Sequence, residues 1–264
     1  MVKPFQEGER LDRHVESLRL FRCEESSNDA RKVLDEVFDR RTMTALYKLM
    51  SNGIIDHIDF ALATGKEGNV FRATTPDGDP VALKIYRINT ATFRSIATYI
   101  EGDPRFKGLS GNHRKLIYAW CTKEFKNLSR MIEAGVRVPQ PIDFHENLLL
   151  MEYLGTDETA APSLRNVTLT MEEAEEFYKE IVKFIKLMYR KAKLVHGDLS
   201  EYNILVHEGV PWIIDCGQAT LADHYNANDL LLRDIKNINR YFRSLDVKVK
   251  SDEEIMRLVK GVKK

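Results

Sequence analysis

The stretch Leu194–Asp215, LVHGDLSEYNILVHEGVPWIID, contains the pattern from which the fold of this 264-residue chain can be inferred. It holds two apolar runs, at residues 204–206 and 212–214, separated by the turn sequence His-Glu-Gly at 207–209. Short apolar runs on both sides of a glycine-containing turn are typical of a β-hairpin. We therefore expect this stretch to fold back on itself, with polar residues at both ends of the hairpin.

Three polar side chains border the predicted hairpin. Asp198 and Asn203 precede its first strand, and Asp215 ends its second strand. The hairpin would bring two carboxylates and an amide to one edge of a sheet. Phosphoryl transfer assisted by Mg²⁺ requires hard oxygen ligands and a spare carboxylate, which this arrangement would supply. The alternative interpretation is a surface loop in which these polar residues occur by chance.

The spacing of these residues matches the protein-kinase catalytic loop, His-x-Asp-x-x-x-x-Asn, at His196, Asp198 and Asn203. An Asp-x-Gly element follows at Asp215 and Gly217. In this interpretation Asp198 orients the acceptor or takes its proton, while Asn203 and Asp215 hold Mg²⁺ against the nucleotide phosphates. The order of the two elements, at hairpin distance, favours catalysis over chance.

The composition is that of a globular chain without a dominant charge. Hydrophobic residues make up 43% of the sequence, and 40 basic residues balance 40 acidic ones. A net charge of zero excludes a global field that would attract nucleic acid, so any basic surface must be local. The length allows one two-lobed domain or two small domains.

The cysteines and the apolar runs predict the compartment of the protein. Three cysteines lie far apart and form no Cys-x-x-Cys pair, which argues against a zinc site or a redox motif. The N-terminal residues lack the apolar core of a leader peptide, and no run of about 18 apolar residues occurs. These features predict a cytoplasmic protein that does not span a membrane.

A glycine-containing loop is expected between two strands of the N-terminal half. Gly65 and Gly68 are followed by Val70, and Lys66 and Glu67 lie at the tip of the loop. Glycines allow the backbone to approach phosphates closely, so this loop is a candidate nucleotide-binding element. It is not a Walker A loop, because no Gly-Lys-Ser/Thr ends it. A simple hairpin turn is the alternative.

Lys84 lies in the middle of an apolar strand predicted at residues 81–86. A buried ammonium needs a counter-ion, or it loses its proton. Glu124 falls inside the apolar stripe of a helix predicted at residues 113–134, where an unpaired carboxylate would be costly. An ion pair between these two residues satisfies both, and the same pair positions the lysine on phosphates in kinases. The alternative is an edge strand whose lysine faces water.

A strand and linker at residues 147–154 would connect two lobes and border an adenine. Glu152 would present its carbonyl and Leu154 its amide, with Met151 at the back of the pocket. An ordinary buried strand is the alternative. The basic connection at residues 87–112 is expected to be a mobile loop, either solvated or in contact with RNA phosphates or a protein acceptor.

Further helices are expected on either side of these motifs. The N-terminal helix is predicted at residues 29–53, where Asn-Gly ends it, and a strand is predicted at residues 54–62. A helix at residues 170–191 opens with a Thr-x-x-Glu capping box. Helices are also predicted from residue 228 onward and at residues 252–259.

Together these segments resemble the RIO family of atypical protein kinases, and the chain looks like the first RIO subfamily in its short, archaeal-style form. The resemblance covers residues 64–220, which is most of the chain, and its motifs are specific. They are TGKEGNVFRA, VALKIYR, YAWCTKEFKNL, AGVRVPQPI, LLMEYLG, LVHGDLSEYNIL and IIDCGQAT.

The resemblance implies an α+β, two-lobed protein-kinase-like fold with an N-terminal helical extension. Such a fold lacks the activation loop and the peptide-substrate subdomains of ordinary protein kinases. The implied division of the chain is an extension at residues 1–53, an N-lobe at 54–151, a hinge at 152–155 and a C-lobe at 156–264.

The resemblance also implies roles for individual residues. Asp198 is the expected catalytic aspartate, and Asp215 is expected both to bind metal and to carry a transient phosphoaspartate. The expected cofactors are ATP and Mg²⁺, or Mn²⁺ in its place. The expected cofactor-binding residues are Gly65, Lys66, Glu67, Gly68, Val70, Lys84, Glu124, Met151, Glu152 and Leu154, and the expected metal ligands are Asn203 and Asp215.

Members of the family hydrolyse ATP, autophosphorylate on Ser or Thr, and act in maturation of the small ribosomal subunit. The resemblance therefore implies a pre-small-ribosomal-subunit particle, with its rRNA and ribosomal proteins, as the partner. The chain itself is the expected substrate of autophosphorylation, and no membrane is involved.

Two departures from ordinary protein kinases bear on the substrate, and a third residue departs from the RIO pattern. Gly197 replaces the Arg of His-Arg-Asp, and no Ala-Pro-Glu follows Asp215. The usual peptide-substrate platform is therefore not expected, and ATP hydrolysis gains weight over phosphorylation of general protein substrates. Gly217 stands where the resemblance predicts Ser or Pro, a change expected to affect loop flexibility rather than metal binding.

Two other functions remain compatible with the sequence. The pattern His-Gly-Asp-Leu-x-x-x-Asn at residues 196–203 also suits small-molecule phosphotransferases of the aminoglycoside or choline kinase type, although the segment YAWCTKEFKNL argues against them. Alternatively, ATP could set the shape of a binding module that docks on the immature subunit. In that case slow chemistry would serve only for release.

Overall fold

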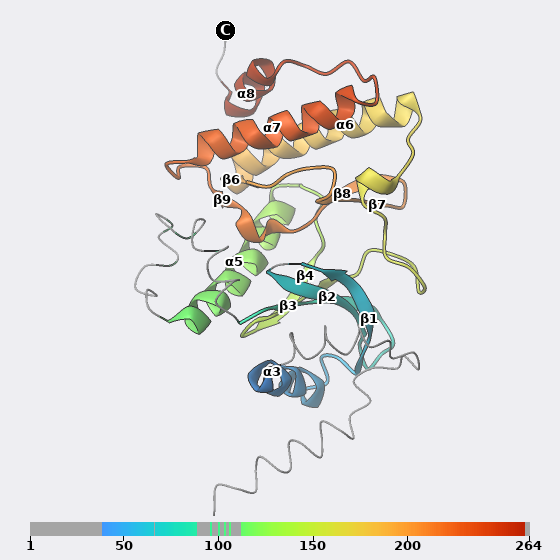
Figure 1. The fold of residues 1–264 in the computed structure, drawn as a ribbon, viewed down its shortest axis with the longest axis vertical. Helices are drawn as coiled ribbons and strands as arrows, with labels where there is room; N and C mark the ends of the chain where they lie inside the picture. The colour runs from blue at the N-terminus through green and yellow to red at the C-terminus, as the bar shows by residue number, and fades with distance from the viewer. Residues whose placement is uncertain are drawn as a thin grey trace, which may run out of the picture.

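The structure is a computed structural model that combines a sheet with a group of helices (Figure 1). The part of the predicted extension before residue 39, the loop residue Lys66 and most of the connection at 87–112 lie outside the described residues. The structure describes residues 39–65, 67–88, 96, 100, 103, 106 and 112–261.

The sheet has five antiparallel strands in the order β1-β2-β3-β5-β4. Lys84 lies on β3, which pairs with β2 on one side and with β5 on the other. The edge-strand alternative for Lys84 is therefore wrong, because both sides of its strand are hydrogen-bonded. The strands are β1 (His57–Thr64), β2 (Gly68–Thr74), β3 (Pro80–Tyr86), β4 (Pro141–His145) and β5 (Leu148–Glu152).

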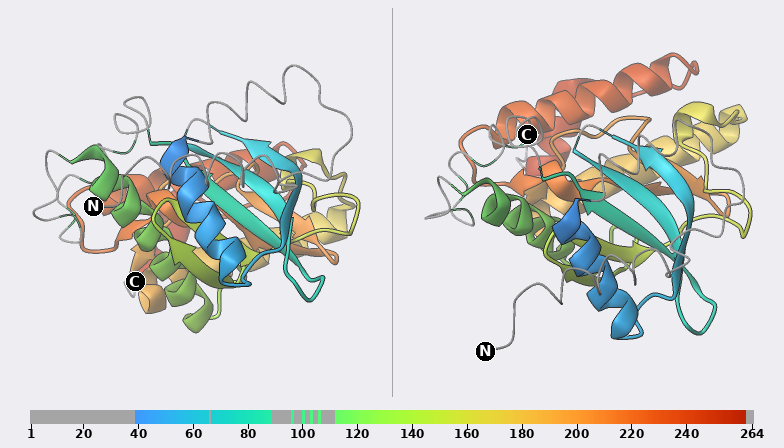
Figure 2. Two further views of the ribbon diagram at one scale, coloured as in Figure 1. Left: turned by 90° about the horizontal axis from the view of Figure 1, so that it is seen from below. Right: turned by 60° about the horizontal axis from the view of Figure 1, so that its bottom comes forward.

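Helix α3 (Arg40–Ser51) covers one face of this sheet (Figure 2). Asp39 caps its N-terminus, and Gly53 follows its C-terminus with φ +70°. The chain then turns, and the amide of Ile54 donates to the carbonyl of Leu49 at 2.9 Å. Because of this turn β1 begins at His57 rather than at residue 54, where the apolar alternation placed it.

The two faces of β3 meet different parts of the molecule. Val81, Leu83 and Ile85 belong to the core cluster that includes the buried side chains of α3. Tyr86 belongs to the second and larger cluster, which contains the C-terminal helices. This alternation is the one expected of a strand buried on both faces, and it directs Lys84 away from α3.

Helix α5 (His113–Glu133) packs on the same side of the sheet as Lys84 and confirms the predicted helix. Asn112 caps its N-terminus, and Gly135 follows its C-terminus with φ +84°. Trp120, Glu124 and Leu128 are buried along one stripe of this helix. The glutamate therefore lies inside the core, as the four-residue spacing predicted.

The C-terminal part of the structure is mainly helical. Helix α6 (Met171–Leu187) opens with the predicted capping box between Thr170 and Glu173, and it continues as the π-helical turn η3 (Met188–Ala192). Helix α7 (Ala227–Arg243) lies beside α6 (Figure 1), and the hydroxyl of Tyr178 donates to Asn239 at 3.0 Å. Helix α8 (Asp252–Lys260) completes the group.

The predicted hairpin is present between the sheet and these helices. Its strands are β7 (Ile204–His207) and β8 (Val210–Ile213). Glu208 and Gly209 at the turn both have positive φ, which is the backbone of a two-residue type I′ turn. Strand β6 (Leu194–Val195) precedes the hairpin and pairs with β9 (Thr220–Leu221), which follows it. Two short helical turns complete this region: η2 (Leu164–Asn166) before the hairpin and η4 (Cys216–Gln218) after it.

Candidate active site

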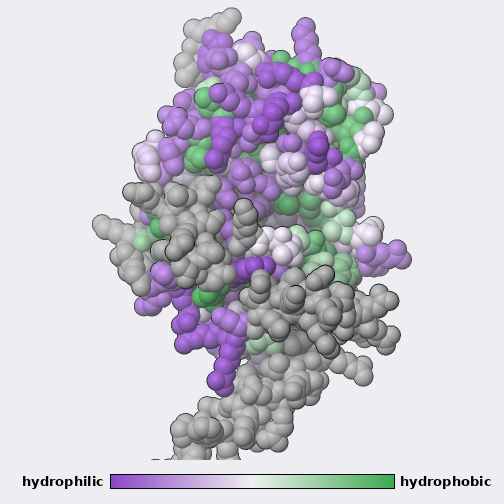
Figure 3. Space-filling model, in the orientation of Figure 1, coloured by the Kyte–Doolittle hydropathy of each residue, from purple (hydrophilic) through white to green (hydrophobic). Residues whose placement is uncertain are grey.

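A cavity of about 570 Å³ lies between the sheet and the hairpin β7–β8. Such a volume is typical of sites for small molecules and cofactors. Its walls come from β1–β3, from α5, from the end of β5 with the segment after it, and from the hairpin. Figure 3 shows hydrophilic residues over most of the surface at α7 and α8, while hydrophobic surface is visible at the level between β1 and the hairpin.

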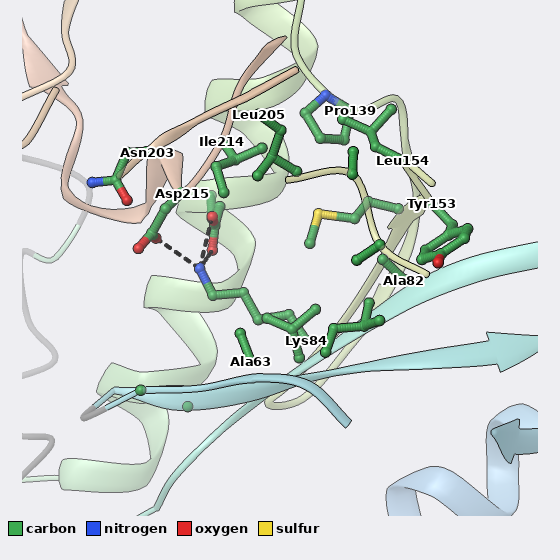
Figure 4. A pocket seen from close by; sticks show the side chains of 18 of the residues that line it. Ala63, Ala82, Lys84, Pro139, Tyr153, Leu154, Asn203, Leu205, Ile214 and Asp215 are labelled. Atoms are coloured by element: carbon green, nitrogen blue, oxygen red, sulfur yellow. Dashed lines mark hydrogen bonds and ion pairs between the residues drawn. The ribbon is translucent and has the colours of Figure 1, made fainter. Parts of the chain in front are cut away.

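Lys84 forms the polar end of this cavity together with two carboxylates (Figure 4). Its Nζ donates to Oε1 and Oε2 of Glu124 at 2.9 and 2.8 Å, and to Oδ1 of Asp215 at 2.8 Å. The exposed fractions of the side chains are 9% for Lys84, 1% for Glu124 and 41% for Asp215. The predicted ion pair is therefore present, and the lysine also bridges to the end of the hairpin.

The charges at this end of the cavity depend on one another. Burial by itself lowers the pKa of Lys84, but the carboxylates of Asp215 and Glu124 outweigh that effect and raise it. The ammonium in turn holds the pKa of Asp215 below its ordinary value, against the effect of burial. The lysine is therefore a permanent cation, and Asp215 is ionised at neutral pH.

Burial raises the pKa of Glu124 to about 7, although the Lys84 ammonium acts in the opposite direction. Glu124 thus depends on the lysine for its charge more than Asp215 does, since Asp215 retains partial contact with solvent. This difference follows from their places: Glu124 lies within α5, while Asp215 lies at the mouth of the hairpin.

Asp215 adopts a left-handed backbone, with φ +58° and ψ +61°. This conformation is uncommon for a residue other than glycine and often occurs where function requires it. It leads from Ile214 directly into the turn η4, and the Asp215 carboxylate reaches Lys84 from the hairpin side (Figure 4).

Asn203 connects the two halves of the catalytic-loop pattern. Its Nδ2 donates to the backbone carbonyl of Asp198 at 2.8 Å and to the Asp198 carboxylate at 3.2 Å. Because the amide nitrogen is engaged in this way, the side-chain oxygen of Asn203 is the atom left to bind a cation. Figure 4 shows Asn203 beside Asp215 at the polar end of the cavity.

The donor set at this end fits a magnesium ion that is shared with phosphates. Asn203 and Asp215 offer hard oxygen atoms, and Mg²⁺ usually takes one or two carboxylates from the protein and completes its shell with phosphate and water. Among the described residues, no group of three or more His, Cys, Asp or Glu side chains is arranged to hold a metal ion.

The other end of the cavity is lined mainly by apolar residues. Met151 and Glu152 at the end of β5 line it, together with Leu154 just after the strand, as predicted for the strand and linker at residues 147–154. The walls also include Ala82, Val70, Pro139, Tyr153, Leu205 and Ile214. Leu205 and Ile214 come from the hairpin, and their place in the cavity was not predicted. The sequence of the hairpin shows that it has two faces, but it does not show which face meets the sheet.

The glycine loop closes the cavity next to Lys84. Gly65, Glu67, Gly68 and Val70 line it, and the amide of Gly65 donates to the carbonyl of Gly68 at 2.9 Å. A Cβ atom on Gly68 would lie 2.4 Å from a backbone oxygen of β3, so only glycine fits there. The absence of a side chain at Gly68 therefore allows the start of β2 to pack directly against the backbone of β3 beside the cavity.

Gln218 is a cavity residue that the sequence analysis missed. Its Nε2 donates to the Glu67 carboxylate at 3.4 Å, which links the turn after Asp215 to the glycine loop. The neighbouring Gly217 is closely packed, since a Cβ there would lie 3.1 Å from Trp120 Nε1 and 3.3 Å from the Tyr86 hydroxyl. A larger side chain at 217 would therefore have to displace these two rings.

The catalytic-loop backbone is held by buried polar groups. His196 donates from Nε2 to the carbonyl of Ile214 at 3.1 Å and accepts the amide of Asp198 at Nδ1. Asp234 on α7 accepts the amides of Gly197 and Leu199 at 2.8 and 2.9 Å. Asp234 was also missed, although the sequence contains a signal for it: like Glu124, it is a carboxylate inside the apolar stripe of a helix.

Comparison with known proteins shows to which protein family this chain belongs. The profile of the RIO domain matches residues 69–255. The chain belongs to the RIO family. It is 43% identical over 223 residues to the RIO-type serine/threonine-protein kinase Rio1 of Haloferax volcanii, an alignment that covers 84% of this chain and 76% of the relative.

Animal members of the RIO family match a smaller part of their own length. The serine/threonine-protein kinase RIO1 of Caenorhabditis elegans is 40% identical over 231 residues, which cover 87% of this chain and 46% of the relative. The human RIO1 kinase is 37% identical, and the alignment covers 41% of it. The chain thus spans less than half the length of these two relatives.

The fold prediction is confirmed by solved structures. The Rio2 kinase from Chaetomium thermophilum, in a complex described as ADP/Mg²⁺-phosphoaspartate, superposes with a TM-score of 0.64 at 24% identity. The match covers 82% of this chain and 65% of that one. Within the part of the chain that the structure describes, no helix is both long and apolar enough to cross a lipid bilayer.

Proposed function

We propose that this RIO-family chain is an atypical serine/threonine protein kinase and ATPase that depends on ATP and Mg²⁺. The observation that carries the proposal is the placement of Lys84, which joins Glu124 and Asp215 at the polar end of the cavity. A cation held there by two carboxylates is suited to bind the phosphates of a nucleotide whose base occupies the apolar end.

The proposed roles follow the geometry of the cavity. Adenine would lie between the sheet and the hairpin, against Met151, with the Glu152 carbonyl and the Leu154 amide as its polar partners. The glycine loop would cover the phosphates. Asn203 and Asp215 would hold Mg²⁺, which neutralises charge on the phosphates when bound.

Asp198 is proposed as the catalytic aspartate. Its carboxylate is held by the amide of Asn203 at 3.2 Å, on the side of the loop that also bears the proposed metal ligands. In that place it can orient the attacking hydroxyl or water, or accept its proton. Asp215 is the candidate carrier of a phosphoaspartate, a species that the solved Rio2 complex with ADP and Mg²⁺ is described as containing.

The short segment after Asp215 favours ATP hydrolysis and autophosphorylation over the phosphorylation of general protein substrates. Between Asp215 and the start of α7 at Ala227 the chain forms only the turn η4 and the two-residue strand β9. No long segment is available there to build a peptide platform. We further propose that the partner is a pre-small-ribosomal-subunit particle in the cytoplasm, a proposal supported by the resemblance of the sequence to the RIO family.

The test follows the γ-phosphate of labelled ATP in the presence of Mg²⁺. Three products are scored: inorganic phosphate, acid-stable protein phosphate and hydroxylamine-sensitive protein phosphate. Wild type is compared with Asp198→Ala, Asp215→Ala and the control Asp223→Ala, which removes an exposed carboxylate from the segment that follows Asp215. The expected result is turnover in wild type and the control, and loss of at least about 100-fold in the two site variants.

The distribution of label separates the two activities. Release of mainly inorganic phosphate, with a hydroxylamine-sensitive fraction that Asp215→Ala abolishes, supports an ATPase with a phosphoaspartate. Mainly acid-stable phosphate that Asp198→Ala abolishes supports a serine/threonine kinase. Wild-type protein that binds no nucleotide and releases no phosphate contradicts the proposal.

A further inference from the structure

The backbone around Asp198 is held almost entirely by side chains. Residues 197–199 follow the end of β6 and belong to no strand or helix, yet each of their backbone N–H and C=O groups has a side-chain partner. Three amides donate to Asp234 and His196, and three carbonyls accept from other side chains. Buried loop backbone needs such partners, because it has neither ladder bonds nor water.

Helix α7 supplies four of these six bonds. Asp234 accepts the amides of Gly197 and Leu199 at 2.8 and 2.9 Å. Arg233 donates from Nη2 to the carbonyl of Gly197, and Asn237 donates from Nδ2 to the carbonyl of Leu199 at 3.1 Å. One turn of a single helix therefore brackets Asp198 from both sides.

The two peptide planes that flank Asp198 are each fixed at both ends. In the plane before it, the carbonyl of Gly197 accepts from Arg233 and the amide of Asp198 donates to His196. In the plane after it, the carbonyl of Asp198 accepts from Asn203 and the amide of Leu199 donates to Asp234. Peptide units are rigid, so fixing both planes fixes φ and ψ of Asp198 and the direction of its Cα–Cβ bond.

Arg233 has no evident role in packing. Its side chain lies on the exposed side of α7, whereas Asp234 is buried in the core. The carbonyl that Arg233 binds belongs to Gly197, whose φ is +81°. The backbone of glycine is freer to rotate than that of any other residue. Without a partner for the Gly197 carbonyl, the plane before Asp198 would be held only by the 3.3 Å bond to His196.

We propose that Arg233 and Asn237 are positioning residues for Asp198, which hold its backbone in the orientation required for phosphoryl transfer. The inference rests on the proposed function of Asp198. Arg233 acts on the peptide plane that directly precedes Asp198, while Asn237 acts one plane further along the chain. The larger effect is therefore assigned to Arg233.

The first test separates positioning from binding by steady-state kinetics of ATP turnover. Arg233→Met removes the donor and keeps the apolar stem, and Arg233→Lys restores a cationic donor. Lys236→Met is the matched control, since it removes an exposed cation of α7 that is not bonded to any described residue of the loop. We expect Arg233→Met to lower kcat about tenfold with KM for ATP within about twofold, because misplacing a catalytic group slows the chemical step.

Rescue decides the role of Arg233. Arg233→Lys should recover most of kcat, the control should match wild type, and Asn237→Leu should lower kcat about threefold. An unchanged kcat in Arg233→Met, or a rise in KM without a change in kcat, overturns the inference. An equal loss in Lys236→Met also overturns it, because the effect would then belong to the charge of the helix.

A second measurement does not depend on activity. Amide hydrogen exchange is followed in the peptide spanning residues 194–203, at a temperature well below unfolding. Faster exchange in Arg233→Met and Asn237→Leu, with wild-type exchange in Lys236→Met, supports the positioning role. Unchanged exchange overturns it. If wild type turns over no ATP, the proposed function fails, and the exchange experiment still decides whether these side chains hold the loop.

Discussion

The sheet side and the helical side of the candidate site are each built around one buried carboxylate. On the sheet side, Glu124 accepts two bonds from the ammonium of Lys84. On the helical side, Asp234 accepts two bonds from backbone amides of the catalytic loop. Both carboxylates interrupt the apolar stripe of a helix, so the same kind of sequence position serves two different purposes.

The difference lies in what each carboxylate holds. Glu124 holds a flexible side chain, which in the proposed function must also reach phosphates. Asp234 holds a backbone that must not move, since Asp198 is carried by it. A charged partner suits the first task because an ammonium can exchange acceptors, while rigid peptide donors suit the second. The comparison predicts that removing the two partners will have different consequences.

The largest effect is expected from Lys84→Met. The change leaves Glu124 and Asp215 without their shared cation, and the loss of one partner from a buried pair costs about 3–5 kcal/mol of unfolding free energy. ATP turnover should also fall at least about 100-fold. Denaturant unfolding and phosphate release measure the two effects.

A second substitution tests the cause of this loss. In Lys84→Met/Glu124→Leu the orphaned carboxylate is replaced by an apolar group, so most of the unfolding free energy should return while turnover stays absent. A double variant that is as unstable as Lys84→Met would contradict the view that Glu124 is the costly residue.

A somewhat smaller loss of stability is expected from Asp234→Ala. Two buried amides, those of Gly197 and Leu199, would lose their acceptors. Each unsatisfied group costs about 1–3 kcal/mol, so the unfolding free energy should fall by about 2–6 kcal/mol. The matched control is Asp229→Ala, which removes an exposed carboxylate from the first turn of the same helix. A loss below about 1 kcal/mol would show that water replaces the carboxylate. An equal loss in the control would show that the effect does not come from the two loop amides.

The smallest effect is a dependence of stability on pH. Burial raises the pKa of Asp234 from 3.8 to about 6, although His196 and the two amides lower it. The folded protein therefore binds a proton more readily than the unfolded chain between these values, and stability should rise as pH falls through about 6. Relative to Asp234→Asn, wild type should gain about 1.4 kcal/mol of unfolding free energy between pH 7.5 and pH 5.

Unfolding of the two proteins at several pH values checks this sign. Asp215 has a pKa lowered by Lys84 and contributes the opposite dependence, but it is present in both proteins and cancels in the difference. The prediction is wrong if the difference in unfolding free energy between the two proteins stays constant with pH, or grows as pH rises. Asp234 would then be ionised throughout, and its bonds to the two amides would lower its pKa more than burial raises it.

Much of the candidate site could be predicted from local patterns. Lys84 and Glu124 were recognisable because each is a charge at an apolar position, and such charges need each other. Asp198, Asn203 and Asp215 were recognisable because their spacing brackets a hairpin with a clear turn. The edge-strand alternative for Lys84 could not be excluded in advance, since the pairing of β3 with β5 joins residues far apart in the chain.

The sequence by itself determined the elements and the residue types at the polar end of the cavity. Alternation, helical spacing, caps and turn residues are local, so they predict β3, α5, α6 and the hairpin without knowledge of their neighbours. The resemblance to the RIO family, now confirmed by the match of its domain to residues 69–255, extended these elements to a fold.

Only the tertiary structure decided how the catalytic loop is held. The bonds from α7 to residues 197–199 cross more than thirty positions of sequence, and they depend on where the helix passes the loop. No periodicity encodes that crossing, because it is set by the packing of α7 against α6 and the small strands. The apolar pattern places Asp234 on the buried face of α7, whereas only the packing of that face shows that it meets the peptide planes of Asp198.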